Sequence, residues 1–373
     1  MNPTIMANHS VLIFIFMYIS TYVHGEENIP CVTPSGAPGQ CVPLKMCSNI
    51  FTLTVLSKNI STKTANYMKS AECNLQRATV EKGICCQPER IFELPERCGL
   101  AVHGKLAHGN ATKVFEFPWM ALLMYRDFST DELVGNCGGT LISDRYVLTA
   151  AHCLFAGRLL KLEYVRLGEH TISKEIDCNN YTDSSGVTEL DCAEPVENIL
   201  IDSYIIHPQY RRTFDGDDVG LIRLDRKVIF KDHIQPICLP ISSHLKDVLL
   251  PEYLVAGWGL TENQDKSDVL LKAKLPRVEL QDCRNKVDSA LKKRQKITIS
   301  EKQVCAGGVN LVDSCQGDSG GPLMWPTEYR NQTRFIQFGV VSYGIEFCGV
   351  IDFPGVYVRI GSYVGWIVAN MKA

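Results

Sequence analysis

From Phe117 onwards, the chain repeats short runs of apolar or alternating residues, separated by turns rich in Gly, Pro, Asn and Asp. The clearest runs are WMALLMY, GTLISDRYVLTAAH, VGLIRL, EYLVAGWG, FIQFGVVSYG and GVYVRI. Short strands between frequent turns are typical of β-barrels and β-sandwiches, so this part of the chain is predicted to be all-β. One helix is expected over residues 362–371, where Tyr363, Trp366, Ile367 and Asn370 fall on or beside one face.

The N-terminal end carries a nine-residue apolar run, residues 11–19. A membrane-spanning helix needs about 20 apolar residues, so this run is too short to cross a bilayer. Val23 and Gly25 lie third and first before a cut after Gly25, which is typical of a secretory signal peptide. We therefore predict a signal peptide over residues 1–25 and a secreted protein. A buried N-terminal strand is the alternative, because the usual basic region before the run is missing and only the α-amine and His9 lie there.

Residues 31–86 hold six cysteines among Pro, Gly, Ser, Thr and Asn, with little helical periodicity. A segment of this size cannot be stable on its hydrophobic core alone, so we predict a small module held by disulfides. Six cysteines allow many connectivities, and their spacing does not choose among them. Residues 87–105 are expected to link this module to a larger domain over residues 106–373.

The composition supports a secreted, disulfide-bonded protein. The chain has 373 residues, long enough for about two domains, and its net charge of −3 gives no reason to expect a nucleic acid or an anionic membrane as partner. All sixteen cysteines follow the expected signal peptide, and no CxxC pairs with another CxxC or with HxxxH, so disulfides are favoured over metal sites. Four sequons are candidate glycan acceptors: Asn59, Asn110, Asn180 and Asn331.

The strongest chemical motif is GDSGGPL, residues 317–323. A serine hydroxyl becomes a good nucleophile only when a base removes its proton and donors stabilise the oxyanion that follows. The flanking glycines let backbone N–H groups converge on that oxyanion without a Cβ in the way. Ser319 is therefore the candidate nucleophile. A glycine-rich turn is the alternative, and the length of the motif argues against it.

The base that the serine needs is expected to be a histidine oriented by a carboxylate. His152 stands out because it ends the apolar run LTAAHC, beside Cys153. Asp218 leads directly into the apolar run VGLIRL, so its burial would require a partner such as an imidazole N–H. Asp217 is expected to face solvent.

LTAAHC, DDVGLIRL and DSCQGDSGGPL, in this order within residues 106–371, resemble the chymotrypsin-fold serine proteases. The resemblance implies two six-stranded antiparallel β-barrels with the site between them. It also implies that His152 is the general base, Asp218 its orienter and Ser319 the nucleophile. The N–H groups of Gly317 and Ser319 would form the oxyanion hole.

The resemblance also implies the specificity of the enzyme. Asp313 precedes the nucleophile by six residues, where the family places the floor of the primary specificity pocket. An unpaired buried carboxylate is costly, and a substrate Lys or Arg would supply the missing cation. Gly344 and Gly355 match the pocket walls that must lack side chains. The expected activity is therefore trypsin-like, while a solvated surface aspartate is the alternative for Asp313.

Activation is expected by cleavage after Lys105. In this family a cut creates an α-amine that threads inward to the carboxylate before the nucleophile, which here is Asp318. The family's Ile-Val-Gly-Gly aligns with Leu106 and the three residues after it, so this chain departs by carrying Leu and His108. Because the cut follows lysine, the activating protease must accept that residue.

The resemblance also pairs the cysteines. The protease motifs imply Cys98–Cys238, Cys137–Cys153, Cys283–Cys305 and Cys315–Cys348, and the remaining Cys178 and Cys192 are expected to close an extra loop. Six N-terminal cysteines that end in an adjacent pair are similar to the clip domain of arthropod clip-domain serine proteases. That family implies the pairs Cys31–Cys85, Cys41–Cys73 and Cys47–Cys86. Cys98–Cys238 would keep the module attached after activation.

The clip-domain family implies a role in proteolytic cascades of the hemolymph, in Toll activation or melanization. The implied partners are an upstream activating protease, a downstream zymogen or precursor protein, and serpin inhibitors. No cofactor is expected for catalysis. GEHTISKEID, residues 168–177, resembles the family's calcium loop, with Glu169, Asp177 and the carbonyls of Thr171 and Lys174 as ligands. A merely solvated pair of acids is the alternative for that loop.

Two other classes of function remain open. The first is a non-enzymatic clip-domain cofactor or adaptor, which the presence of all three candidate catalytic residues argues against. The second is a developmental or digestive protease. A tethered disulfide-rich module argues against digestion, which needs no docking domain.

Overall fold

The fold was analysed in a computed structural model. It describes residues 29–34, 36, 38–43, 62–74, 82–86, 94–95, 97–100, 111–155, 157, 159–182, 186–211, 216–261, 265–290, 298–308, 315–329, 331–343 and 353–371. The chain divides into two compact units, Met1–Pro88 and Glu89–Ala373. The expected signal peptide lies outside the described residues. No helix among those residues is long and apolar enough to cross a membrane.

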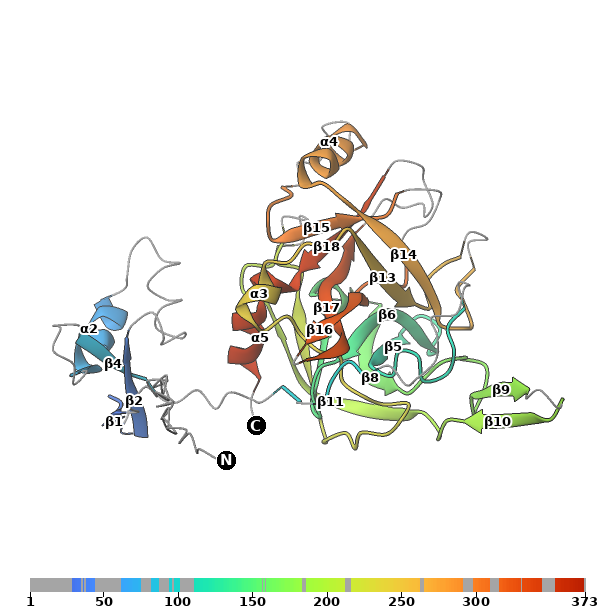
Figure 1. The fold of residues 1–373 in the computed structure, drawn as a ribbon, viewed down its shortest axis with the longest axis horizontal. Coiled ribbons are helices and arrows are strands. Elements are labelled where there is room, and N and C mark those ends of the chain that lie inside the picture. The colour runs from blue at the N-terminus through green and yellow to red at the C-terminus, as the bar shows by residue number, and fades with distance from the viewer. Residues whose placement is uncertain are drawn as a thin grey trace, which may run out of the picture. The chain divides into compact units, whose positions relative to one another are not determined.

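The described residues of the N-terminal unit form a four-stranded antiparallel sheet in the order β1-β2-β4-β3 and the helix α2 (Figure 1). The elements are β1 (Ile29–Val32), β2 (Pro38–Pro43), α2 (Thr62–Ser70), β3 (Glu72–Asn74) and β4 (Lys82–Cys86). Its apolar core is small, with Ala71 and Ile84 buried and Met68 and Cys86 packed against them. So small a core is consistent with the expected dependence on disulfides. Sequence reasoning did not anticipate α2, which lies between the third and fourth cysteines.

The second unit contains two closed six-stranded barrels, as the fold-class prediction required (Figure 1). The first has the order β11-β12-β7-β6-β5-β8. Its strands are β5 (Met120–Asp127), β6 (Leu133–Leu141), β7 (Tyr146–Thr149), β8 (Leu160–Leu167), β11 (Glu197–Ile206) and β12 (Gly220–Leu224). The apolar run that predicted a strand at residues 119–125 forms β5, and its first residues are buried on both faces. A continuous apolar run is expected for a strand with no solvent-facing side.

The second barrel has the order β13-β14-β15-β18-β17-β16. Its strands are β13 (Glu252–Gly257), β14 (Leu271–Val278), β15 (Gln303–Ala306), β16 (Pro322–Tyr329), β17 (Gln332–Tyr343) and β18 (Gly355–Arg359). The barrels also meet through side chains, since the Thr140 hydroxyl on β6 donates to Gln337 Oε1 on β17 at 2.6 Å. Both side chains are buried. The junction between the barrels is therefore packed and hydrogen-bonded.

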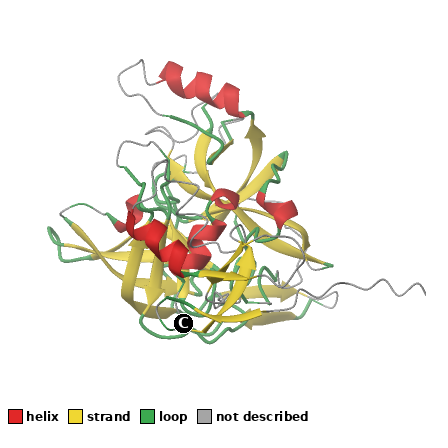
Figure 2. Cartoon of the chain, turned by 90° about the vertical axis from the view of Figure 1, so that its left-hand side faces the viewer, coloured by secondary structure: helices red, strands yellow, loops and turns green. Residues whose placement is uncertain are grey.

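Few helices accompany the barrels, and Figure 2 shows strands as the dominant element. They are η2 (His152–Leu154), α3 (Ser243–Lys246), α4 (Leu280–Ala290), η3 (Ile360–Ser362) and α5 (Val364–Asn370). The helix expected over residues 362–371 is thus present as a 3₁₀ turn followed by α5, which buries Val364 and Ile367. Sequence reasoning did not anticipate α4. A two-stranded hairpin, β9 (Cys178–Thr182) and β10 (Thr188–Cys192), projects from the first barrel (Figure 1).

Candidate active site

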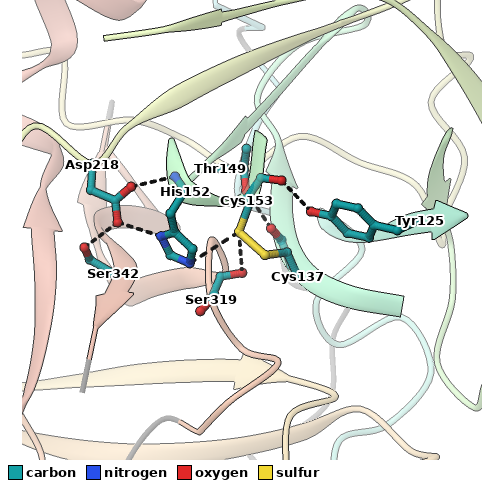
Figure 3. The surroundings of a disulfide bond; sticks show 9 residues. Tyr125, Cys137, Thr149, His152, Cys153, Asp218, Ser319 and Ser342 are labelled. Atoms are coloured by element: carbon teal, nitrogen blue, oxygen red, sulfur yellow. Dashed lines mark hydrogen bonds and ion pairs between the residues drawn. A yellow bond between two sulfur atoms is a disulfide. The ribbon is translucent and has the colours of Figure 1, made fainter. Parts of the chain in front are cut away.

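His152 and Asp218 are brought together at the end of the first barrel. His152 opens η2 three residues after β7 ends, and Asp218 lies just before β12. The strands β7 and β12 pair directly, so the two side chains meet at the same end of the barrel. His152 Nδ1 lies 2.7 Å from Asp218 Oδ2, and the backbone N–H of His152 donates to Oδ1 at 2.9 Å. Both carboxylate oxygens therefore hold the histidine in one orientation (Figure 3).

A third donor reaches Asp218 from the second barrel. The hydroxyl of Ser342, on β17, donates to Oδ2 at 2.6 Å. Burial alone would raise the pKa of Asp218, but the charge of His152 and these hydrogen bonds outweigh it, so the pKa is lowered. Burial alone would lower the pKa of His152, but the charge and hydrogen bond of Asp218 outweigh it, so that pKa is raised. The buried aspartate is thus held ionised beside an imidazole that can accept a proton.

Ser319 lies beside the imidazole, on a loop of the second barrel (Figure 3). Its backbone carbonyl accepts a hydrogen bond from the N–H of Gly138, on β6, at 2.7 Å. This bond crosses from one barrel to the other and places the serine against the first barrel. Ser319 and His152 line one cavity of about 200 Å³, whose other residues are Tyr125, Asn136, Cys137, Cys153, Gln316 and Gly317. The three residues predicted to form the triad, Ser319, His152 and Asp218, therefore lie close together.

Gly317 has the backbone conformation that the oxyanion prediction needs. Its φ is +105°, and a Cβ there would lie 2.9 Å from Gly259 Cα, so no side chain fits. Gly320 also has a positive φ, at +80°. The N–H groups of Asp318 and Gly320 donate to the carbonyls of Cys315 and Val341. The oxyanion hole at Gly317 and Ser319 therefore stays a prediction, which the conformation of Gly317 allows.

Asp318 points away from the cavity and into the second barrel. Its Oδ1 accepts from the N–H of Gly259 at 2.9 Å and its Oδ2 from the N–H of Cys315 at 2.8 Å. Part of the residue is exposed, but the carboxylate is packed so closely on Gly257 and Gly259 that a Cβ at Gly257 would lie 2.0 Å from Oδ1. Burial raises the pKa of Asp318 to about 6, although the two N–H donors oppose it. No cationic side chain among the described residues is paired with it. The carboxylate is therefore poised to receive a positive charge.

The expectation that Asp217 faces solvent was wrong. The residue is 8% exposed, and its carboxylate lies 2.7 Å from Lys302 Nζ and accepts from the Tyr363 hydroxyl at 3.0 Å. His207 Nδ1 lies 3.6 Å away, and its ring packs edge-on against Tyr363. These partners lie up to 146 residues along the chain, which is why local sequence did not reveal the burial.

Several predicted residues lie outside the described residues. These are Lys105 and Leu106 of the expected activation site, and Asp313 and Gly344 of the expected specificity pocket. The remaining pocket residue, Gly355, is buried at the start of β18, where it pairs with Ala306 on β15. The pocket floor and the activation bond therefore stay predictions from sequence.

The expected calcium loop has two buried carboxylates, Glu169 and Asp177. Glu169 Oε2 is 3.2 Å from Arg166 Nη1, and Asp177 Oδ2 accepts from the N–H of Thr171 at 3.1 Å. The carbonyl of Thr171 accepts from the N–H of Lys174 at 2.9 Å. Burial raises the pKa of Glu169, Arg166 opposes this, and the charge of Asp177 adds to it. Arg166 therefore contacts Glu169 alone of the two acids, while His170 Nδ1 lies 3.9 Å from Asp177 Oδ1. The carboxylate and carbonyl oxygens of this loop are of the kind that a hard cation binds.

Six of the eight expected disulfides lie among the described residues. The structure joins Cys31–Cys85, Cys41–Cys73, Cys98–Cys238, Cys137–Cys153, Cys178–Cys192 and Cys283–Cys305. Cys86 and Cys315 are also disulfide-bonded, while their expected partners, Cys47 and Cys348, lie outside the described residues. Of the sequon asparagines, Asn180 and Asn331 are exposed, and Asn59 and Asn110 lie outside the described residues.

Sequence reasoning missed three contributors to the site. Ser342 was part of a run used only to predict a strand, and Lys302 and Tyr363 carried no local signal. The serine could have been noticed as a polar residue inside the apolar run FGVVSYG, because a polar residue in a buried strand needs a partner.

The fold and the geometry of the site define a class of protein, a two-barrel serine hydrolase. A family model described as Trypsin matches residues 107–367, and one described as Regulatory CLIP domain of proteinases matches residues 31–86. The chain therefore belongs to the trypsin family of serine proteases, in the group that carries an N-terminal clip domain.

Individual relatives match over nearly the whole chain. The chain is 37% identical to serine protease grass of Drosophila melanogaster, covering 92% of this chain and 91% of the relative. It is 38% identical to phenoloxidase-activating factor 3 of Holotrichia diomphalia, covering 95% of this chain and 97% of that relative. A crystal structure of the Drosophila Grass clip serine protease of the Toll pathway matches with a TM-score of 0.67 and 36% identity. The match covers 92% of this chain and 97% of the chain in that structure.

Proposed function

We propose that this protein is the zymogen of a secreted trypsin-like endopeptidase in which Ser319, His152 and Asp218 form the catalytic triad. The observation that carries the proposal is the 2.7 Å contact between His152 and the buried Asp218, beside the cavity that Ser319 shares. A buried aspartate orienting a half-exposed histidine next to a serine is the arrangement that serine hydrolysis requires.

The mechanism follows from the roles of these groups. His152 Nε2 removes the proton of the Ser319 hydroxyl while the oxygen attacks the substrate carbonyl. Asp218 holds the Nδ1–H and stabilises the imidazolium that forms. The N–H groups of Gly317 and Ser319 bind the oxyanion, where losing one donor costs about 10²–10³-fold in rate. The imidazolium then protonates the leaving amine, and a water molecule, activated by the same histidine, hydrolyses the acyl-enzyme.

Specificity and activation belong to the same proposal. Asp313 would bind the Lys or Arg side chain before the cleaved bond, with Gly344 and Gly355 leaving room for it. Cleavage after Lys105 would free the amine of Leu106 to pair with Asp318. The buried carboxylate with two N–H donors and a raised pKa supports this role, because an incoming cation would relieve its burial.

The biological setting is proposed from the relatives. The clip module, together with names that refer to the Toll pathway and to phenoloxidase activation, supports a cascade of innate immunity in the hemolymph. The partners would be an activating protease, a downstream zymogen or precursor, and serpins. The same names support two alternative branches of such a cascade, one that activates Toll and one that leads to melanization.

A structural Ca²⁺ is a further part of the proposal. Glu169 and Asp177 would hold it, with the carbonyls of Thr171 and Lys174. It would add positive charge beside Glu169, which contacts Arg166, and beside Asp177, whose Oδ1 lies 3.9 Å from His170 Nδ1. The ion would stabilise the loop and take no part in catalysis.

The test uses the full chain with a controlled activation site. The changes Ala101→Asp, Val102→Asp, His103→Asp and Gly104→Asp create an enteropeptidase site that is cut after Lys105 and leaves Leu106 as the new N-terminus. Cleaved protein should react with a fluorophosphonate probe and hydrolyse arginine and lysine p-nitroanilides, whereas Ser319→Ala should do neither. Cleaved protein that fails to react would support the non-enzymatic adaptor instead. Mixing the active enzyme with candidate zymogens and reading their new N-termini would identify the branch.

A further inference from the structure

Lys266 connects the nucleophile loop to the first barrel through two short links. Its Nζ donates to the backbone carbonyl of Gly135, on β6, at 2.7 Å. Its own backbone pairs with Leu260, whose N–H donates to the carbonyl of Gln316 at 2.8 Å. The lysine is therefore attached to the nucleophile loop through Gln316, while its ammonium reaches the first barrel beside Asn136.

This position lies on the side of the site where the leaving group must depart. The leaving amine takes its proton from His152 Nε2, and that nitrogen lies 3.7 Å from Cys153 Sγ. The cavity that His152 lines is also lined by the Cys137–Cys153 disulfide and by Asn136, the residue between Gly135 and Cys137. The peptide that follows the cleaved bond is thus directed along β6 towards Gly135.

The distance fits the second residue after the cleaved bond. Gly135 precedes Cys137 by two residues of β6, which is about 7 Å along a strand. Two residues of extended substrate cover about the same length. A side chain at that substrate position would reach the ammonium of Lys266.

The charge around this part of the site favours an acid. The residues that line the cavity include no Asp or Glu. Lys266 has no ion pair with a carboxylate among the described residues, although its neighbour Asp265 is acidic. Lys266 is an exposed residue whose ammonium is open to a partner from solution. Partial burial lowers its pKa, and an anionic partner would favour its charged form.

We propose that Lys266 is a specificity residue that binds an acidic side chain of the protein substrate, two residues after the cleaved bond. The proposal rests on the proposed protease function and deepens it. The natural substrate would then carry Lys or Arg at the cleaved bond, followed within two residues by Asp or Glu. Such a subsite would distinguish the correct zymogen or precursor from other proteins with exposed basic residues.

The experiment compares quenched fluorescent peptides that differ only at the second residue after the cleaved bond, which is Glu, Gln or Lys. The enzyme is the full chain cleaved after Lys105, as wild type, Lys266→Met, Lys266→Glu and Lys274→Met. The last is a matched control, because Lys274 pairs with Glu252 at 2.8 Å on the second barrel. An arginine p-nitroanilide, which has no peptide after the cleaved bond, reports whether the catalytic machinery is intact.

We expect wild type and Lys274→Met to prefer Glu over Gln by roughly three- to tenfold in kcat/KM, as for a partly exposed charge pair. The preference should disappear in Lys266→Met, reverse towards Lys in Lys266→Glu, and weaken with added salt. All variants should hydrolyse the anilide at similar rates. Equal cleavage of Glu and Gln peptides by wild type, or a preference unchanged in Lys266→Met, would overturn this subsite alone. Failure to hydrolyse the anilide would overturn the proposed function, and the subsite with it.

Discussion

The ammonium of Lys302 lies 2.7 Å from the carboxylate of Asp217, the residue that directly precedes Asp218. Asp217 has a φ of +57°, a left-handed conformation that non-glycine residues adopt rarely and that Asp and Asn tolerate best. Lys302 and Tyr363 come from the second barrel and its C-terminal segment. These contacts therefore hold the backbone that presents Asp218 to His152.

Replacing Lys302 should weaken this support. In Lys302→Met, the buried carboxylate of Asp217 keeps the hydrogen bond from the Tyr363 hydroxyl but loses the Lys302 ammonium. We therefore expect the free energy of unfolding to fall by about 1–3 kcal/mol. kcat should fall several-fold because Asp218 is held less firmly. Thermal unfolding and anilide hydrolysis measure the two effects. Lys274→Met, which breaks an exposed pair, should change stability by less than about 1 kcal/mol. Equal effects of the two variants would contradict the argument.

The pH dependence of activity should report the contact between His152 and Asp218. His152 must be neutral to act as a base, so activity is lost as pH falls through its raised pKa. In Asp218→Asn the charge that raises this pKa is gone, so the acid limb should move to lower pH. The rate should also fall by about 10⁴-fold, a magnitude known from the chymotrypsin-fold triad itself. An acid limb that stays in place would show that another group controls it.

The raised pKa of Asp318 predicts how the stability of the uncleaved chain depends on pH. This pKa is raised to about 6, so the folded chain binds more protons than the unfolded chain between about pH 4 and 6. The free energy of unfolding should therefore fall as pH rises through this window, by about 3 kcal/mol for this group. Denaturant unfolding at several pH values measures this slope.

Two comparisons make the assignment to Asp318 specific. The slope should be absent in uncleaved Asp318→Asn. Cleavage after Lys105 should also remove it, because the amine of Leu106 then neutralises the carboxylate. A slope that survives in both would have to come from other groups.

The Cys98–Cys238 disulfide predicts that activation does not release the clip module. Cys98 precedes the proposed cleavage site and Cys238 follows it, with an S–S distance of 2.01 Å. Protein cleaved after Lys105 should run as one species on a non-reducing gel and as two after reduction. The double variant Cys98→Ser with Cys238→Ser should separate into two chains without reductant. Separation of the wild-type chains without reductant would refute the tether.

Calcium should stabilise the folded chain if the loop over residues 168–177 binds it. Ca²⁺ would balance the buried charge of Glu169 and Asp177, so added Ca²⁺ should raise Tm. The rise should grow with the logarithm of the free Ca²⁺ concentration once this exceeds Kd. Asp177→Asn should abolish the rise, while Asp191→Asn, on the exposed strand β10, should retain it. A wild-type Tm that does not change with added Ca²⁺ would contradict a calcium site in this loop.

The barrels were predictable because their strands are short, apolar and separated by turn residues. The helix α4 was not, because only Cys283 and Val287 of its residues are buried, which leaves too narrow an apolar face to recognise. Likewise, most of the α2 side chains that the structure describes are exposed, so its sequence lacks a helical apolar face.

The candidate catalytic residues were recognisable because their motifs are local. The contacts that surround them were not, because they join distant parts of the chain: Ser342 to Asp218, Lys302 to Asp217, and Asp318 to the backbone of Gly259. The two acids at positions 217 and 218 look alike in sequence. Each is buried by partners that only the fold brings near.

The hydrogen bond from the Gly138 N–H to the Ser319 carbonyl joins residues of both barrels, so neither barrel forms the candidate active site by itself. If the two halves were produced as separate polypeptides, each would be inert, and hydrolysis would return only when they reassembled. A compound that separates the two barrels would inhibit the proposed protease without binding where the substrate binds.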